Sequence, residues 1–245
     1  MVINVHGGHN RIVPGASGYL DEVTEDRAVT AQVIAKLRAL GHTVYDCTDD
    51  SGRTQGQNLA NIVHACNAHA ADLDVSIHLN SGGGTGTEVL VYSDTGEAAG
   101  YAVKICAAIS ELGYRNRGVK ERKALYVLRR TTAPALLVEC CFVDSAADAQ
   151  RFDADKMAAA IVRGITGQTA AQTGAAPAQQ TGYHVRITAS TLNVRRDHSA
   201  SSAVATQVRR GEVYTIVDEY NNGGTLWGKL KSGAGWIALK YTQSV

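Results

Sequence analysis

The segment VINVHGGHN, residues 2–10, decides how the fold begins. Residues 2–6 are rich in β-branched apolar side chains, so we predict a strand there, and the two glycines that follow predict a turn. His6 and His9 flank these glycines. The segment is therefore either a turn with polar decoration or the first part of a metal site, and a metal site needs further ligands from elsewhere in the chain.

Strand-like and helix-like patterns alternate outward from this segment as far as residue 166. Between the apolar runs, hydrophobic residues recur at helical spacing, as in 24–40, where Gly41 supplies the stop. This alternation predicts an α/β domain over 1–166, with a mostly parallel sheet flanked by helices. The predicted strands are 2–6, 42–47, 73–78, 87–92, 125–128 and 135–142, and the predicted helices are 24–40, 55–70, 95–112 and 145–165.

The pattern changes after residue 166. Residues 167–182, GQTAAQTGAAPAQQTG, carry no charge and no aromatic side chain, which predicts a flexible linker. Residues 183–245 hold short apolar runs separated by turns rich in Gly and Asn, which predicts a small all-β barrel. The runs are YHVRIT, LNVR, VYTIVDEY, WGKLK and GWIAL.

Composition and charge limit the classes of function that the chain can have. The chain has 245 residues, 44% of them hydrophobic, and a net charge of +1, which argues against a general nucleic-acid binder. Residues 183–245 hold eight Lys and Arg against four Asp and Glu, so this part is basic and suits attachment to an anionic polymer. No apolar run reaches the roughly 18 residues of a membrane span, and the first residues do not resemble a signal peptide, so we expect no membrane insertion.

The five cysteines are odd in number and form no C-x-x-C motif. We therefore expect no disulfide framework and a reduced, cytosolic origin. Cys47, Cys66 and Cys106 are expected to be small buried apolar residues.

Histidines and acids follow the ends of three predicted strands and begin one helix. His9 follows the first strand, His78 ends DVSIH, and Glu139 ends ALLVE, where a lone carboxylate needs a partner. Two imidazoles and one carboxylate form a tetrahedral zinc set that leaves one position for water, and zinc lowers the pKa of such water to about 7. Glu22 and Glu25 compete for the carboxylate position, although Glu25 could instead favour the helix dipole.

A structural interpretation of these side chains stays open at this point, because a histidine at a strand end is commonly just hydrogen-bonded. The remaining histidines are interpreted as surface or structural residues: His42, His64, His69, His184 and His198.

Four segments together resemble the zinc-dependent N-acetylmuramoyl-L-alanine amidases of the amidase-3 type. They are INVHGGHN, LDEVTEDRAVTAQVIAKLRALGHTV, DVSIHLN and ALLVECCFVD, in the family's order and spacing. The resemblance implies an amidase-3 fold over 1–166, zinc held by His9, Glu22 and His78, and a catalytic Glu139. His6 stands where the family frequently has Asp, and Asn10 where it frequently has a second glycine, so the role of His6 stays open.

The tail resembles bacterial SH3-type domains through TLNVRRDHSASSAVATQVRRGEVYTIVDE and WGKLKSGAGWIALKYT. Such domains bind cell-wall peptide or glycan. The resemblance makes four aromatic residues candidates for a wall-binding surface, and in so small a barrel at least one Trp is expected in the core. The candidates are Trp227, Trp236, Tyr220 and Tyr241.

The two resemblances imply a peptidoglycan hydrolase that cleaves the amide between N-acetylmuramic acid and L-alanine with a zinc-activated water. They suggest a phage endolysin that stays in the cytoplasm of the infected host until a membrane pore releases it, with a host autolysin as an alternative. Two other functions compete: a cysteine-dependent wall peptidase acting through Cys140 or Cys141, and an inactive wall-binding protein. The sequence sets neither the oligomeric state nor zinc over manganese or cobalt.

Overall fold

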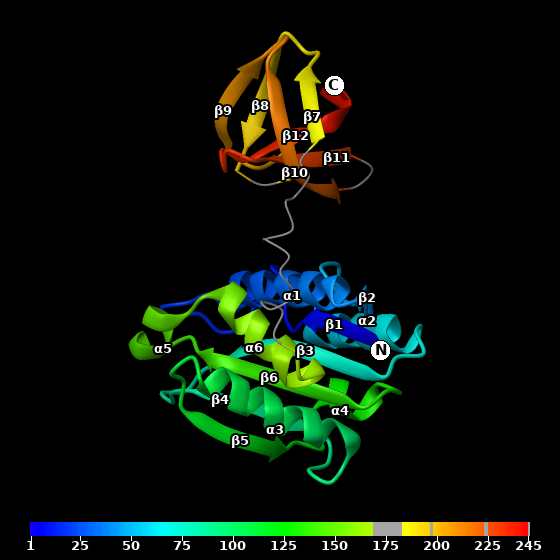
Figure 1. Ribbon diagram of the computed structural model, residues 1–245, viewed down its shortest axis with the longest axis vertical. Coiled ribbons are helices and arrows are strands. Elements are labelled where there is room, and N and C mark those ends of the chain that lie inside the picture. The colour runs from blue at the N-terminus through cyan, green and yellow to red at the C-terminus, as the bar shows by residue number, and fades with distance from the viewer. Residues whose placement is uncertain (169–182, 197, 223–224, 245) are drawn as a thin grey trace. The chain divides into compact units, whose positions relative to one another are not determined.

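A computed structural model of the chain describes residues 1–168, 183–196, 198–222 and 225–244. The chain divides into two compact units, Met1–Gln172 and Thr173–Val245, and each is described by itself (Figure 1). Most of the predicted linker, residues 169–182, lies outside the described residues.

The first unit is built on one mixed sheet of six strands in the order β2-β1-β3-β6-β4-β5. Neighbouring strands are parallel except β4 and β6, which run antiparallel. The α/β prediction is confirmed, and the antiparallel pair is what makes the sheet mixed. The strands are β1 (Val2–Gly7), β2 (Thr43–Asp46), β3 (Leu73–Asn80), β4 (Thr87–Val91), β5 (Asn116–Glu121) and β6 (Ala135–Phe142).

Six helices accompany this sheet. The longest, α1, begins where the Asp21 side chain accepts the Thr24 N–H, and α2 begins where Thr54 does the same for Gln57. Among the described residues, no helix combines the length and apolarity of a membrane span. The helices are α1 (Glu22–Ala39), α2 (Gln55–Asn67), α3 (Glu97–Ser110), α4 (Tyr126–Arg130), α5 (Ala146–Arg151) and α6 (Ala154–Thr166).

Two predicted elements were wrong, and one strand was missed. Residues 125–128 begin helix α4 instead of forming a strand, because so short an apolar run fits either state. The strand β5 was not predicted, since NRGVKE is polar and lies at the sheet edge. The predicted helix 145–165 is two helices, because Asp153 caps the Asp155 and Lys156 N–H groups and starts α6 afresh.

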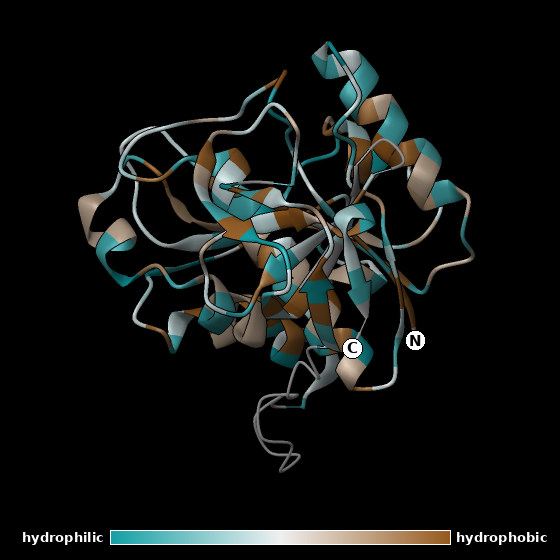
Figure 2. Ribbon diagram, turned by 90° about the horizontal axis from the view of Figure 1, so that it is seen from above, coloured by the Kyte–Doolittle hydropathy of each residue, from teal (hydrophilic) through white to brown (hydrophobic). Residues whose placement is uncertain are grey.

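The sheet carries hydrophobic cores on both faces. Apolar residues of β1, β3 and β6, such as Val5, Ile77 and Val138, pack with α1, α3 and α6. Leu137 points to the opposite face, where α2 and α4 pack. In Figure 2 the hydrophobic colour falls mainly on strands and helices, and the loops are mostly polar. Since side chains alternate along a strand, His78 and Glu139 emerge on the α2 and α4 face.

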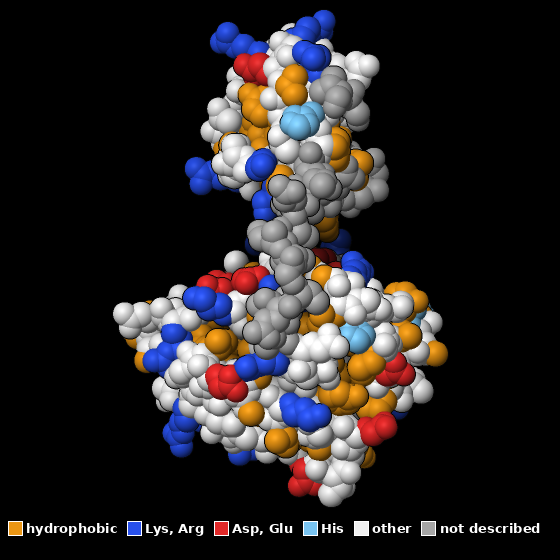
Figure 3. All heavy atoms as spheres, in the orientation of Figure 1, with side chains coloured by type: hydrophobic (Ala, Val, Ile, Leu, Met, Phe, Trp, Pro, Cys, Tyr) orange, Lys and Arg blue, Asp and Glu red, His pale blue; other side chains and the backbone are white. Residues whose placement is uncertain are grey.

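The second unit is an all-β structure with one seven-stranded sheet, in the order β13-β7-β10-β11-β12-β8-β9. Val194, Ile216 and Ile237 lie in its core. The all-β prediction is confirmed, although β9 and β13 were not predicted. Figure 3 shows Lys and Arg side chains on the visible face of this unit. The strands are β7 (Tyr183–Ile187), β8 (Thr191–Arg195), β9 (Val204–Arg209), β10 (Val213–Asn222), β11 (Thr225–Leu230), β12 (Trp236–Ala238) and β13 (Thr242–Ser244), with a 3₁₀ turn at Leu239–Tyr241.

Candidate metal centre

The strand order locates the site. From β1 the chain passes through α1 to β2 on one side and through α2 to β3 on the other, so the sheet reverses its winding between β1 and β3. Open α/β sheets bind ligands at such a point, outside the carboxyl ends of the strands. His9 follows β1, and His78 lies near the end of β3, so both stand at this edge.

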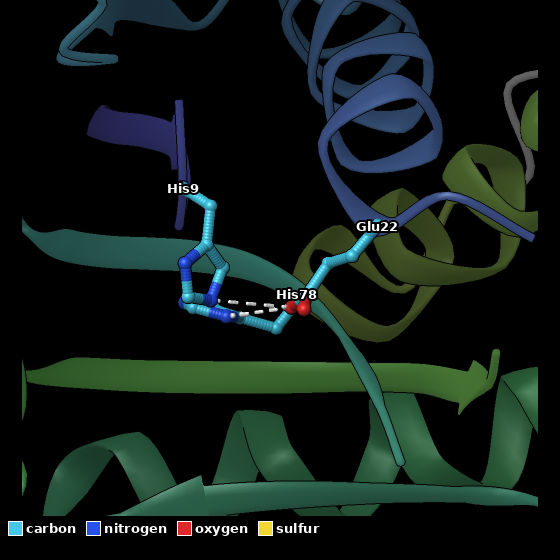
Figure 4. A group of neighbouring side chains, drawn as sticks. All are labelled: His9, Glu22 and His78. Atoms are coloured by element: carbon cyan, nitrogen blue, oxygen red, sulfur yellow. Dashed lines mark hydrogen bonds and ion pairs between the residues drawn. The ribbon is translucent and has the colours of Figure 1, made fainter. Parts of the chain in front are cut away.

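Three predicted side chains converge there (Figure 4). The Nε2 atom of His9 lies 3.5 Å from Oε1 of Glu22, and the Nδ1 atom of His78 lies 3.1 Å from the same oxygen. One ligand atom from each residue lies within 4.8 Å of the others. The two imidazole rings meet edge to face, with centroids 5.1 Å apart. Residues 69 positions apart in the sequence therefore present their nitrogens to one carboxylate.

Glu22 is fixed by the start of α1, of which it is the first residue. Its carboxylate accepts the Ala16 N–H at 2.7 Å through Oε2 and the Leu79 N–H at 3.1 Å through Oε1. Burial by itself raises the pKa of Glu22, but the hydrogen bond and charge of His78 outweigh it, so the pKa lies below its ordinary value. Glu22 is thus an ionised carboxylate held in place by backbone donors.

Two glycines of the first loop, Gly8 and Gly15, have a steric purpose. A Cβ atom built on Gly8 would collide with the His78 ring, and one built on Gly15 would collide with the Glu22 carboxylate. Only glycine lets the backbone of the first loop pass this close to the neighbouring ligands. The loop is therefore part of the metal centre as well as a turn.

The donor types, two imidazoles and one carboxylate, fit zinc, and so do the two separations from Glu22. A tetrahedral ion with bonds of about 2.05 Å needs donor atoms roughly 3.3 Å apart, close to the 3.1 and 3.5 Å separations from Glu22. Burial lowers the pKa of His9, which favours the neutral imidazole that a metal requires. For His78, burial lowers the pKa, but the Glu22 hydrogen bond and the charges of Glu139 and Glu22 raise it above its ordinary value.

Glu139 lies beside this set. It pairs with His78 across the β3–β6 ladder and with Glu88 across β4–β6. Its Oε2 atom is buried without a hydrogen-bond partner, and Thr87 Oγ1 donates to its backbone carbonyl. Burial raises the pKa of Glu139 to about 7, and the charges of Glu22 and Glu88 add to the rise while His78 opposes it. Such a carboxyl can take up and release a proton near neutral pH.

The hydrogen bonds around Glu88, the neighbour of Glu139 on β4, were not predicted from the sequence. Glu88 accepts a hydrogen bond from Asn80 Nδ2 at 3.1 Å and from Arg117 Nε at 2.8 Å. The Arg117 guanidinium also lies over the Phe142 ring, 4.9 Å from its centroid. Arg117 comes from β5, the strand that was not predicted, so the local pattern offered no signal for it.

His6 and Glu25, the two alternative candidates for the metal, lie outside the group of three side chains. His6 is 1% exposed, and its Nδ1 lies 3.2 Å from the Gly7 carbonyl oxygen and 3.5 Å from Ser76 Oγ. Burial lowers the pKa of His6 to about 3, so this ring is neutral. Glu25 is half-buried on α1. Within the described part of the chain, neither residue joins the group formed by His9, Glu22 and His78.

The hydrogen bonds of Asn10 explain why an asparagine stands where the family frequently has a second glycine. Its Oδ1 accepts the N–H groups of Ile12 and Val13 at 2.9 and 2.7 Å, and its Nδ2 donates to the Gly52 carbonyl at 2.9 Å. The side chain is completely buried. Asn10 therefore folds the loop after His9 and ties it to the loop after β2.

The surroundings of the cysteines disfavour a nucleophilic role. All five are free and buried, as predicted for Cys47, Cys66 and Cys106. Burial raises the pKa of Cys140 and that of Cys141 well above the ordinary thiol value, which disfavours the thiolate that attack requires.

The four aromatic candidates of the second unit fall into two groups. Trp227, only 5% exposed, and Tyr241 line a cavity of about 690 Å³ that Arg195 and Lys240 also line. In the other group, Tyr220 stacks on His198 with ring centroids 3.7 Å apart, and Trp236 meets the same ring edge-on at 5.2 Å.

Comparison with known proteins supports the amidase assignment of the first unit. A family model described as N-acetylmuramoyl-L-alanine amidase, Amidase_3, matches residues 1–167. The chain belongs to this amidase family. The match covers the unit that carries the candidate metal centre.

Among its relatives is the sporulation-specific N-acetylmuramoyl-L-alanine amidase of Bacillus subtilis, 31% identical over 209 residues, covering 83% of this chain and 80% of the relative. An uncharacterised protein of Clostridium perfringens is 38% identical over 154 residues, which cover 60% of this chain. The alignment spans only 45% of that longer relative. Among solved structures, the catalytic domain of the CD27L endolysin targeting Clostridia difficile matches 69% of this chain and 98% of its own length, with 26% identity and a TM-score of 0.64.

Proposed function

We propose that this amidase hydrolyses bacterial peptidoglycan at the amide between N-acetylmuramic acid and L-alanine, with zinc as its cofactor. The observation that carries the proposal is the convergence of His9, Glu22 and His78 beside the unpartnered carboxyl oxygen of Glu139. The amidase names of the family and of the Bacillus subtilis relative support the choice of bond.

His9, Glu22 and His78 would hold the ion. Zinc, when bound there, supplies Lewis-acid chemistry that polarises the scissile carbonyl and makes a water acidic. Glu139 accepts the proton of the attacking water at Oε2, the buried atom that has no other partner. It then delivers this proton to the departing L-alanine nitrogen, because an amine leaves only when protonated. Burial, which raises the pKa of Glu139 in the metal-free protein, favours the uptake of this proton.

Digestion of purified cell walls tests this proposal. The zinc-loaded protein should release new L-alanine amino termini without new reducing sugar, and new reducing ends would refute the amide assignment. A chelator should abolish the release, and zinc should restore it. Activity that survives complete metal removal would favour the cysteine-dependent alternative. A metal-free, inert protein that still binds walls would favour the inactive wall-binding alternative.

Glu139→Gln supplies the mechanistic control. This variant should bind zinc as the wild type does and lose turnover by about 10²-fold or more, the range expected when a general acid–base is removed. Full activity of the variant would remove Glu139 from the mechanism.

We also propose that the second unit is an SH3-like module that binds the wall. Its cavity supports this proposal, because aromatic side chains and the cations Arg195 and Lys240 line it together. Tyr241→Ala alters this cavity, whereas Tyr220→Ala alters the group around His198. Sedimentation with purified walls distinguishes the two surfaces: loss of binding with Tyr241→Ala alone assigns the cavity. Unchanged binding in both variants would refute a role for these aromatic residues.

The similarity to an endolysin catalytic domain supports a phage endolysin, and the Bacillus subtilis sporulation amidase represents the host-enzyme alternative. Residence in the cytoplasm of the infected host before release stays a proposal from the sequence.

A further inference from the structure

An ion pair on α1, formed by the buried Asp26 and the partly exposed Arg27, lies against the backbone of the loop that carries His9. Asp26 is completely buried, and its Oδ1 accepts a hydrogen bond from Arg27 Nη1 at 2.9 Å. Its Oδ2 faces the N–H groups of Gly8 and His9 at 3.2 and 3.5 Å. Burial raises the pKa of the Asp26 carboxyl, and the Arg27 guanidinium opposes that rise.

Arg27 makes further contacts with this loop. Its Nη2 atom donates to the backbone carbonyl of His9 and pairs with Asp50 Oδ1 at 2.8 Å. A Cβ atom on Gly7 would collide with this guanidinium, so the first glycine of the pair makes room for Arg27 as the second does for His78. One planar cation therefore joins the His9 backbone, α1 and the loop after β2.

We infer that Arg27, seated on Asp26, is a positioning residue that orients the metal ligand His9. The inference rests on the proposed function, because it assumes that His9 binds zinc. His9 needs such support more than its partners. Glu22 begins a helix and His78 belongs to a central strand, whereas His9 lies in a loop whose direction is set by a few contacts. Substituting a residue that orients a metal ligand typically lowers metal affinity by about 10–100-fold.

Arg27→Lys tests this inference with little change in charge. A single ammonium group cannot reproduce the fork that reaches a carbonyl and two carboxylates at once. Arg151→Lys is the matched control. Arg151 donates to the Gly113 carbonyl at 2.8 Å and lies 3.9 Å from the buried carboxylate of Asp148, but it contacts no metal-site residue. The readout is the zinc dissociation constant of the full chain, measured by chelator competition, together with helix unfolding followed by circular dichroism.

We expect Arg27→Lys to weaken zinc binding about ten-fold and Arg151→Lys to leave it within about two-fold, even where both lower stability equally. The effect should disappear in a His9→Ala background and persist in a His78→Ala background, since only the first removes the ligand through which Arg27 acts. An equal effect of Arg27→Lys in both backgrounds would overturn the inference, as would unchanged zinc affinity. A wild-type chain that fails to bind zinc would refute the metal site of the proposed function, and the inference with it.

Discussion

Replacing Glu139 by Gln should stabilise the metal-free protein at high pH, and it should remove the activity of the zinc-loaded protein. In the folded protein, burial raises the pKa of Glu139 to about 7, from an ordinary value of 4.5. The folded state therefore holds this proton more tightly than the unfolded state. The stability that the proton contributes is present below pH 4.5 and is lost as the pH rises through 7.

The magnitude follows from the size of the shift. A difference of about 2.5 pKa units corresponds to about 3 kcal/mol at 1.36 kcal/mol per unit. The free energy of unfolding of the wild type should fall by about this amount between pH 4 and pH 8 relative to Glu139→Gln, which has no proton to lose. For a unit of this size, about 3 kcal/mol is a difference of roughly 6–12 °C in melting temperature.

The distribution of chromophores makes the assay specific. Among the described residues, the six α-helices lie in the first unit, and both Trp residues lie in the second. Ellipticity at 222 nm in a chelating buffer therefore follows the unit that contains Glu139, and Trp fluorescence follows the other. Only the 222 nm transition should show the pH-dependent difference. Added zinc should reduce it, because a nearby cation stabilises the carboxylate.

Glu88→Gln is the matched control, since it makes the same change on the neighbouring strand. The Glu88 carboxylate is already paired with Arg117 at 2.8 Å. The substitution leaves the Arg117 guanidinium without this carboxylate, so it should lower the free energy of unfolding at pH 8. The reasoning about Glu139 is refuted if Glu139→Gln and the wild type lose stability in parallel between pH 4 and pH 8, or if both Gln variants shift in the same direction.

Three further substitutions probe the site. Gly8→Ala should weaken zinc binding about ten-fold or more by displacing the His78 ring, whereas Gly56→Ala, which meets open space on α2, should not change the measured dissociation constant. Asn10→Gly should cost about 1–3 kcal/mol in urea unfolding at 222 nm, because it removes three hydrogen bonds to the loop backbone; an unchanged midpoint would contradict this role. Cys141→Ala should retain wall digestion, and its loss without unfolding would revive the thiol mechanism.

The sequence pattern predicted the α/β architecture, and the resemblance to the amidases selected His9, Glu22 and His78, which the structure places together. These residues stand at the ends of apolar strands or at a helix start, and the sheet topology brings such positions to one edge. The assignment of Glu22 over Glu25 also agrees with the geometry, because only Glu22 is turned toward both imidazoles.

Long-range partners could not be predicted in this way. Arg117 reaches the site from an edge strand whose polar sequence resembles a loop, and its pairing with Glu88 depends on the order of β4, β5 and β6. Arg27 has the helical position and polarity of an ordinary surface residue. Only the approach of the Gly7–His9 backbone makes its guanidinium part of the site. Local periodicity contains no information about either approach.

The charges around His78 connect these observations. Glu22, Glu139 and Asp26 each raise the pKa of this imidazole, so in the metal-free protein a proton on His78 is the nearest compensation for the surrounding acids. A protonated imidazole cannot bind a metal, and a divalent cation would supply the same compensation with more charge. If a metal binds at this centre as proposed, its binding should therefore release the His78 proton, and the surrounding acids should favour the ion.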